Sequence, residues 1–538
     1  MKTIYYNGNI YTGDRANPHA AVMLVEDNRI AAVGGEELLS LQEEDVQRID
    51  LKGSCVTPGL MDTHMHTAHM SRNLSEAQLA GLTSAEALVE RVRDFIEKNR
   101  IPEGEWVRGE GWNQDLFEKP ILPDRHLLDQ ISTNHPILLT RVCGHCVAAN
   151  TMALSVMGVT ADTPCPPGGS FSLGEDGQPD GLFYEDGIGL IRPARKLLTQ
   201  AEVEKLLTIG LNTAASLGLT TLGSDDLRSL NCPWETVMDA YKALQARDEM
   251  PVRVMQECRL PALTLLDDFF ACGYGAGWGN DIFRVGSIKL FADGSLGARS
   301  AYLRAPYADA PETVGIAVCT QQEMDALVWK AHSHDMPVAV HAIGDGAVEM
   351  VLDAVRTAQQ REAKPHLRHG IVHCQITDRA LLERIASEGL QVYAQPVFLE
   401  YDLHIAEARV GHELASTSYA FKTLYDMGVN VSGGSDCPVE SLNPLCGIYC
   451  AVTRKDYNGL PEGGFFPEEC FDRQQALEIF TQGGAYAFGM EDRLGKLKPG
   501  MLADFAVFDR DIMACEADEL LDTHAIMTVV DGKVRYQR

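Results

Sequence analysis

Short apolar runs recur along the middle of the chain and predict buried strands. Stretches with helical spacing of apolar residues, such as 321–333 and 346–360, lie between them. Strands that alternate with helices favour a parallel sheet covered by helices, and eight such repeats favour a closed barrel. The fold class predicted is therefore α/β, with a TIM-type (β/α)8 barrel. The strand candidates are residues 56–62, 219–223, 252–257, 286–291, 337–341, 369–373, 391–395 and 429–433.

Both ends of the chain have a different pattern, that of short strands joined by tight turns. Near the N-terminus, β-forming residues flank Asn7-Gly8, and near the C-terminus they flank Asp531-Gly532. These dipeptides are strong hairpin signals. Two small β segments at opposite ends share a core only if they meet. Residues 1–56 and 490–538 are therefore predicted to form one discontinuous β-sandwich, with the barrel occupying 57–489.

The spacing of the first two predicted barrel strands is unusual, because more than 150 residues separate them. Connections within α/β barrels are normally far shorter. Residues 70–200 are therefore predicted to be a subdomain inserted after strand 1. This segment has a helix-like stretch at 84–98 and an apolar strand-like run at 136–140.

The charge balance narrows the classes of partner. The chain has 46 basic and 76 acidic residues and a net charge of −30. Nucleic-acid and anionic membrane surfaces attract clustered cations, so neither is an expected partner. No apolar run approaches the ~20 residues of a membrane span. The 14 cysteines are scattered and no apolar leader is evident, which favours a reduced, cytoplasmic location.

The first candidate site residues are two histidines that follow the first apolar strand. His64 and His66 are one residue apart in the run PGLMDTHMH at 58–66. Side chains alternate along a strand, so both imidazoles point to the same face. Two imidazoles that converge on one point are typical ligands of a divalent cation.

Four more candidates lie at the ends of later strands: Lys289, His341, His373 and Asp436. Barrel enzymes collect their functional side chains at the carboxyl ends of the strands, so these groups are expected to converge with the histidine pair. Each also has a structural interpretation. A single histidine can be a polar core residue, Asp436 can cap a turn, and Lys289 can pair with Asp436 or Asp293.

Lys289 is the least usual of these residues, because apolar neighbours predict its burial and a buried, unpaired ammonium is costly. An alternative is that Lys289 reacts with carbon dioxide to form a carbamate. That anion could bridge two cations about 3.5–4 Å apart. Asp436 could take a proton from a metal-bound water and return it to a leaving nitrogen, which makes it the catalytic candidate.

The motifs resemble those of the amidohydrolase superfamily, and most closely its amidohydrolase-3 branch of exoenzyme-regulator-like and N-substituted formamide deformylase-like proteins. The similarity extends to residues 495–505, where the chain returns to the terminal strands. The segments that carry it are PGLMDTHMH at 58–66, KLFADGSLG at 289–297, HAIGDGA at 341–347, HCQ at 373–375 and GGSDCPV at 433–439.

The resemblance implies a set of metal ligands. His64, His66 and Asp436 would hold the more buried ion, and His341 and His373 would hold the second. Carboxylated Lys289 would bridge the two. The implied metal is most often zinc, with one or two ions per chain.

The implied reaction is hydrolysis of a non-peptide, amide-type carbon–nitrogen bond of a small molecule by a metal-bound hydroxide. Two alternatives stay open: a mononuclear deaminase or cyclic-amide hydrolase, and a metal-binding protein without turnover. No glutamate follows His341 until Glu349, which disfavours a nucleobase deaminase. Trp112 and His145 match positions of the insertion in this branch and, with Asp293, are the substrate-binding candidates. The alternative for Trp112 and His145 is that they pack the insertion's own core. A homodimer is the oligomer considered.

Overall fold

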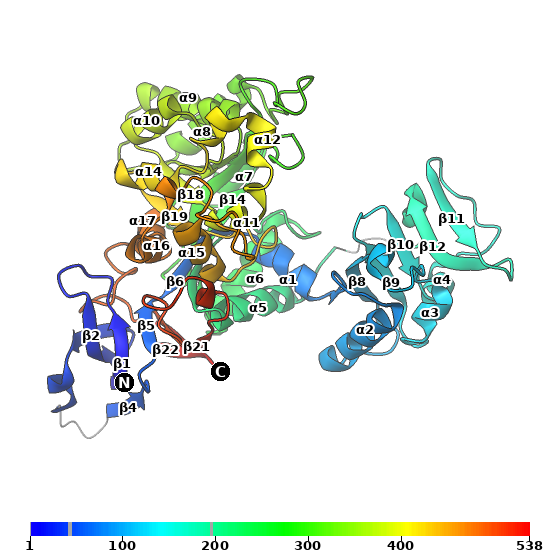
Figure 1. Ribbon diagram of the computed structural model, residues 1–538, viewed down its shortest axis with the longest axis horizontal. Helices are drawn as coiled ribbons and strands as arrows, with labels where there is room; N and C mark the ends of the chain where they lie inside the picture. The colour runs from blue at the N-terminus through cyan, green and yellow to red at the C-terminus, as the bar shows by residue number, and fades with distance from the viewer. Residues whose placement is uncertain (1, 41–45, 194–196) are drawn as a thin grey trace. The chain divides into compact units, whose positions relative to one another are not determined.

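A computed structural model describes residues 2–40, 46–193 and 197–538. Residues 1, 41–45 and 194–196, which the sequence analysis assigned to the sandwich and the insertion, lie outside the described residues. The chain divides into two compact units (Figure 1). One comprises Met1–His69 and Thr199–Arg538, and the other comprises Met70–Leu198.

The first unit contains the barrel, whose eight strands pair in parallel with their neighbours. The first and last strands also meet, because the Thr63 side chain donates a hydrogen bond of 3.0 Å from Oγ1 to the Gly433 backbone carbonyl. The TIM-type fold class is confirmed. The strands in order are β6 (Leu60–Met65), β13 (Leu219–Ser224), β14 (Arg253–Arg259), β15 (Phe283–Phe291), β16 (Val338–Ala342), β17 (Gly370–His373), β18 (Gln391–Ala394) and β19 (Val431–Gly433).

Helices follow the strands and cover the barrel. The apolar face of α9 (Asp345–Arg361) shows why: Val348, Val351, Leu352 and Val355 recur at helical spacing and are buried. The other helices are α5 (Gln200–Ser216), α6 (Trp234–Ala246), α7 (Leu263–Ala271), α8 (Gln321–Ser333), α10 (Arg379–Glu388), α11 (Leu399–Asp402), α12 (Ala406–Val410), α13 (His412–Ala415), α14 (Phe421–Asp426), α15 (Pro444–Thr453), α16 (Arg473–Ile479) and α17 (Gln482–Ala487).

The first predicted strand, 56–62, is in fact two strands. β5 (Cys55–Pro58) belongs to the terminal sheet and β6 belongs to the barrel, and Gly59 separates them. A Cβ at Gly59 would lie 2.2 Å from Thr220 Oγ1, so only glycine allows this close crossing. The continuous apolar pattern of 56–62 hides the break, because both halves are buried.

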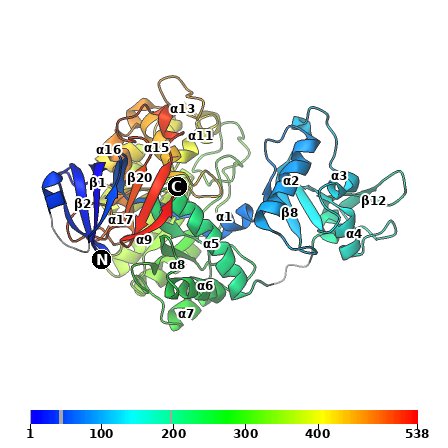
Figure 2. The same cartoon turned by 90° about the horizontal axis from the view of Figure 1, so that it is seen from below.

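Strands from the two ends of the chain join in one sheet of the order β22-β21-β20-β5-β1-β2-β3, and β4 pairs with β1. Figure 2 shows N-terminal strands beside the C-terminal ones. β5 and β20 are antiparallel, with Val56 opposite Val507, and Tyr5 packs edge-on against Phe505. The bounds are β1 (Lys2–Tyr11), β2 (His19–Glu26), β3 (Arg29–Gly34), β4 (Val46–Asp50), β20 (Phe505–Phe508), β21 (Ala525–Val530) and β22 (Lys533–Gln537).

The second unit contains a six-stranded sheet of the order β11-β12-β10-β9-β8-β7 with its own apolar core. The sheet mixes parallel and antiparallel pairs. Among the described residues of the whole chain, no helix is both long and apolar enough to cross a membrane. The elements are α1 (Thr67–Leu74), β7 (Ala77–Gln78), α2 (Ala85–Asn99), β8 (Val107–Trp112), α3 (Arg125–Asp129), β9 (Ile137–Arg141), β10 (Cys146–Ala149), α4 (Thr151–Met157), β11 (Gly169–Leu173) and β12 (Pro179–Glu185).

Candidate metal centre

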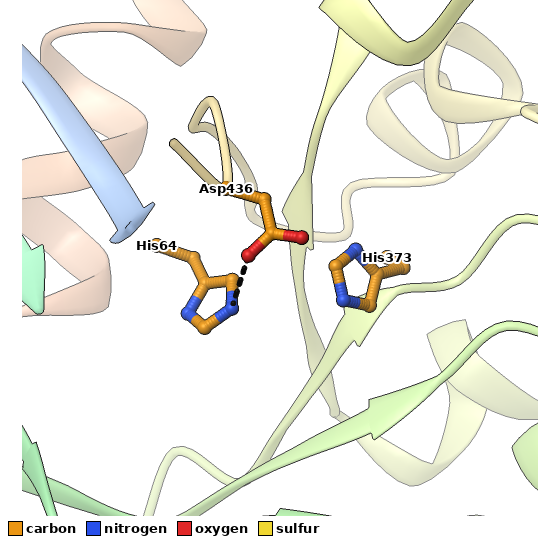
Figure 3. Close-up of side chains that lie close together, drawn as sticks. All are labelled: His64, His373 and Asp436. Carbon is orange, nitrogen blue, oxygen red and sulfur yellow. Dashed lines mark ion pairs between the residues drawn. The ribbon is translucent and has the colours of Figure 1, made fainter. Parts of the chain in front are cut away.

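The barrel brings together side chains from five of its strands at their carboxyl ends. His64 lies in β6 and His66 directly after it, while His373 ends β17. The ligand atoms of His64, His373 and Asp436 all lie within 4.8 Å of one another. Figure 3 shows the Asp436 carboxylate between the two imidazoles. All three side chains are buried.

Asp436 is the centre of this cluster. Its Oδ1 atom lies 3.2 Å from His64 Nε2 and 3.0 Å from His66 Nε2. Burial opposes ionisation, but the hydrogen bonds to the two histidines hold the pKa of Asp436 well below its usual value. The residue occupies a left-handed backbone conformation with a φ of 57°, which is uncommon for a residue other than glycine.

A buried carboxylate fixes the loop that carries Asp436. Asp62 accepts hydrogen bonds of 3.1 Å from the backbone amides of His64 and Ser435. Burial raises the pKa of Asp62 to about 7. One side chain of β6 therefore holds both the strand and the loop after β19 in register.

His64 and His66 each use one ring nitrogen, Nδ1, to contact a group outside the cluster. His64 Nδ1 lies 2.6 Å from Glu257 Oε2, and His66 Nδ1 lies 3.1 Å from the Asp225 carbonyl. Their Nε2 atoms consequently point toward Asp436. Burial lowers the basicity of His64, but Glu257 and Asp436 outweigh this effect and raise its pKa to about 9.

His341 and His373 are also each held through one ring nitrogen, Nε2 in His341 and Nδ1 in His373. His373 Nδ1 donates to Gln395 Oε1 at 2.8 Å, and His341 Nε2 donates to the Gly294 carbonyl at 2.9 Å. Their rings pack edge to face with centroids 4.5 Å apart. Burial, followed by the neighbouring His341, lowers the pKa of His373 well below its usual value. A neutral imidazole is the form that binds a metal ion.

Lys289 lies in β15 and is fully buried, as its apolar neighbours predict. In the described part of the chain it makes no ion pair with Asp436 or Asp293, and its Nζ atom has no hydrogen-bond partner. The ammonium lies 4.3 Å above the Phe291 ring. Burial lowers the pKa of Lys289, although Glu257 and Asp225 act in the opposite direction.

The donor set fits a divalent cation. Imidazole nitrogens and carboxylate oxygens are ligands of zinc and of other first-row metals, and they do not choose among these metals. Both carboxylate oxygens of Asp225 and one oxygen of Glu257 are buried without a hydrogen-bond donor. This excess of buried negative charge is what a cation would neutralise.

Three residues that surround the histidines were not predicted from the sequence: Glu257, Asp225 and Gln395. Each lies at or just after the carboxyl end of a barrel strand, where the other candidates were found. That position was the available signal. Glu257 and Asp225 follow predicted apolar runs as polar residues, and both are buried.

The three predicted substrate-binding residues have different surroundings. Trp112 is fully buried in the core of the second unit, where its Nε1 donates to the Leu139 carbonyl, so in this structure it packs the core of the inserted segment. His145 is exposed and pairs with Glu185. Asp293 is buried and accepts backbone hydrogen bonds from Tyr302, Ile343 and Gly344, which makes it a positioning group beside His341.

Comparison with solved structures places the whole chain among metal-dependent hydrolases. An uncharacterised metal-dependent hydrolase from Pyrococcus horikoshii is 26% identical, with a TM-score of 0.75, over 96% of this chain and 99% of that one. A similar hydrolase from Pyrococcus furiosus is 28% identical, with a TM-score of 0.73, over 95% of this chain and 100% of that one.

Sequence relatives cover the same length. YtcJ of Bacillus subtilis is 32% identical over 100% of both chains. The N-substituted formamide deformylase of Arthrobacter pascens is 27% identical over 99% of this chain and 98% of its own. The model of the amidohydrolase family matches residues 47–536. The predicted family is thus confirmed, and the chain belongs to the amidohydrolase family, in its amidohydrolase-3 branch.

Proposed function

We propose that this protein hydrolyses an amide-type, non-peptide carbon–nitrogen bond of a small molecule with the help of a bound divalent cation. The observation that carries the proposal is the convergence of His64, His373 and Asp436, whose ligand atoms lie within 4.8 Å of one another inside the barrel. The oriented ring nitrogens of His64 and His373 support it.

The chain's own residues have distinct roles in this reaction. His64, His66 and Asp436 would hold one ion, and His341 and His373 would hold a second. When bound, a divalent cation supplies Lewis acidity, which acidifies water and polarises a carbonyl oxygen. Asp436 would move the proton, because its carboxylate lies beside His64 and His66, where the ion would be bound.

Lys289 is proposed to be carboxylated on Nζ. A carbamate forms from a neutral amine, and burial favours the neutral form of Lys289. The Nζ atom has no hydrogen-bond partner, which supports the same assignment. We propose zinc as the metal, since imidazoles and a carboxylate suit it.

The amide class of substrate follows from the family and from one relative whose name states its reaction, an N-substituted formamide deformylase. We propose a cytoplasmic location on the basis of the cysteines, all 14 of which are free thiols. We also propose a small-molecule substrate and no nucleic-acid partner, since the chain's net charge of −30 disfavours binding to a phosphate backbone.

The direct test is a screen of N-formyl, N-acyl and cyclic amides against protein reconstituted with Zn²⁺ in bicarbonate buffer. Metal-dependent turnover of an amide that disappears in the Asp436→Asn variant is the expected result. A metal-loaded protein that hydrolyses no member of these classes would favour the alternative of a metal-binding protein without turnover.

A further inference from the structure

Arg259 stands at the mouth of the barrel beside the candidate metal centre. It is the last residue of β14 and lies opposite Lys289 of β15 in the strand register. It is two residues after Glu257, which contacts His64, so both side chains are on the inner face of the strand. A permanent positive charge is thereby placed next to the site.

Among the residues that the structure describes, no acidic side chain forms an ion pair with the guanidinium group of Arg259. Within the described ranges it forms neither an ion pair nor a hydrogen bond, and its Nε atom is buried without an acceptor. Asp225 is near enough for the two charges to interact, yet neither of its carboxylate oxygens receives a hydrogen bond. A half-buried arginine without an acceptor loses hydration and gains no ion pair in return.

Two successive contacts with the Phe291 ring link Arg259 to His341, one of the candidate metal ligands. The Cζ atom of Arg259 lies 4.5 Å from the centroid of Phe291, whose ring in turn stacks on His341 at 5.0 Å. Cation–π contact with Phe291 holds the guanidinium in place. One aromatic ring thus separates the guanidinium from His341, a candidate metal ligand.

We propose that Arg259 binds a carboxylate of the substrate, so that the enzyme selects anionic amides such as N-acyl amino acids over neutral ones. The proposal rests on the proposed function and names the substrate class of that site. A guanidinium offers several N–H donors in a fixed plane and binds a carboxylate through two parallel hydrogen bonds. Arg259 is therefore a specificity-determining residue that does not take part in the proton transfer.

The test compares pairs of amides that have the same shape and different charge. N-acetyl amino acids are measured against their primary carboxamides, with acetate release by the zinc-loaded enzyme as the readout. The wild-type protein is expected to favour the carboxylates in kcat/KM by about tenfold to a hundredfold, the usual worth of a charged hydrogen bond. Arg259→Gln is expected to abolish this preference and Arg259→Lys to keep part of it.

Two controls separate this role from others. Arg247→Gln removes an exposed arginine that pairs with Glu204 and Glu249, and it is expected to leave the preference unchanged. Calorimetric titration of the zinc-loaded Asp436→Asn protein with the same pairs, with and without Arg259→Gln, measures binding without turnover. Metal content of the Arg259→Gln protein shows whether the residue instead supports the ions.

The possible outcomes distinguish failure of the inference about Arg259 from failure of the proposed function. A carboxylate preference that persists in Arg259→Gln, or a wild-type enzyme that hydrolyses neutral amides only, overturns the inference and leaves the proposed function standing. Arg259-dependent binding of carboxylates without any turnover keeps the inference and contradicts the proposed function. Loss of metal from Arg259→Gln, with equal loss of activity on both members of each pair, also overturns the inference.

Discussion

Glu257 Oε2 lies 2.6 Å from Nδ1 of His64, and both side chains are buried at the inner face of the barrel. A carboxylate that accepts this hydrogen bond fixes the ring orientation and increases the basicity of the opposite nitrogen. The pair therefore does two things before any ion binds: it directs Nε2 toward Asp436 and strengthens it as a ligand.

Glu257→Gln is expected to weaken metal binding about tenfold to a hundredfold, because a neutral amide polarises His64 less than a carboxylate does. Competition with a chromogenic chelator measures the affinity. Glu249→Gln, at an exposed glutamate that pairs with Arg247, is the matched control. Unchanged affinity in Glu257→Gln would show that the carboxylate has no part in ligand strength.

Asp436→Asn is expected to lower kcat by about a thousandfold or more, since the amide cannot accept the proton that the reaction releases. The variant keeps an oxygen toward His64 and His66, so most of its zinc is expected to remain. Steady-state kinetics and elemental analysis of the same sample check both points. Activity near that of the wild type would remove the proton-transfer role.

Lys289→Ala is expected to lose at least one metal equivalent and most activity, because the bridging carbamate cannot form. Short carboxylates such as acetate or propionate are expected to restore part of both by entering the space that the side chain leaves. Full metal content and activity in the variant, without added acid, would contradict a carbamate on Lys289. In a crystal structure of the parent protein, electron density extending beyond Nζ of Lys289 would show the carbamate directly.

Glu440, at the barrel mouth, gives a pH dependence of stability. Burial, together with Glu400 and Asp402, raises its pKa from 4.5 to about 7. Between pH 4.5 and about pH 7, Glu440 is ionised in the unfolded chain but still protonated in the folded chain. The free energy of unfolding therefore falls as the pH rises through this window. Above it, Glu440 is ionised in both states and its destabilising contribution is constant. Metal-free protein shows the effect without the field of the ions.

Metal-free Glu440→Gln is therefore expected to be more stable than the parent at pH 8.5, by about 1 kcal/mol after allowing for solvent screening. The difference is expected to vanish near pH 4.5, the ordinary pKa of the group. Thermal unfolding at both pH values measures it, with Glu413→Gln on exposed α13 as the control. An equal shift at the two pH values would rule out the ionisation of Glu440 as its cause.

Much of the barrel was predictable from sequence because its strands are short apolar runs between helical segments. The predicted runs 219–223, 391–395 and 429–433 correspond closely to β13, β18 and β19. The position of a polar residue at the end of each run then gives the site, since parallel strands deliver their carboxyl ends to one rim. His64, His373 and Asp436 converge for this reason.

Other features depend on contacts that no local pattern encodes. The break at Gly59 comes from the close approach of Thr220, a residue far along the chain. Trp112 could line a pocket or fill a core, and its hydrogen bond to Leu139 within the second unit decides for the core. Glu257 and Asp225 become important only once His64 and His66 lie beside them in the closed barrel.

The central claim is that these side chains hold a divalent cation, and anomalous X-ray scattering from crystals grown with Zn²⁺ tests it most directly. The account predicts a strong peak at the zinc absorption edge in contact with Nε2 of His64, Nε2 of His66 and the Asp436 carboxylate, at ligand distances of about 2.0–2.2 Å. Zinc-saturated protein with no peak at these three side chains, or with its zinc elsewhere on the chain, would contradict it.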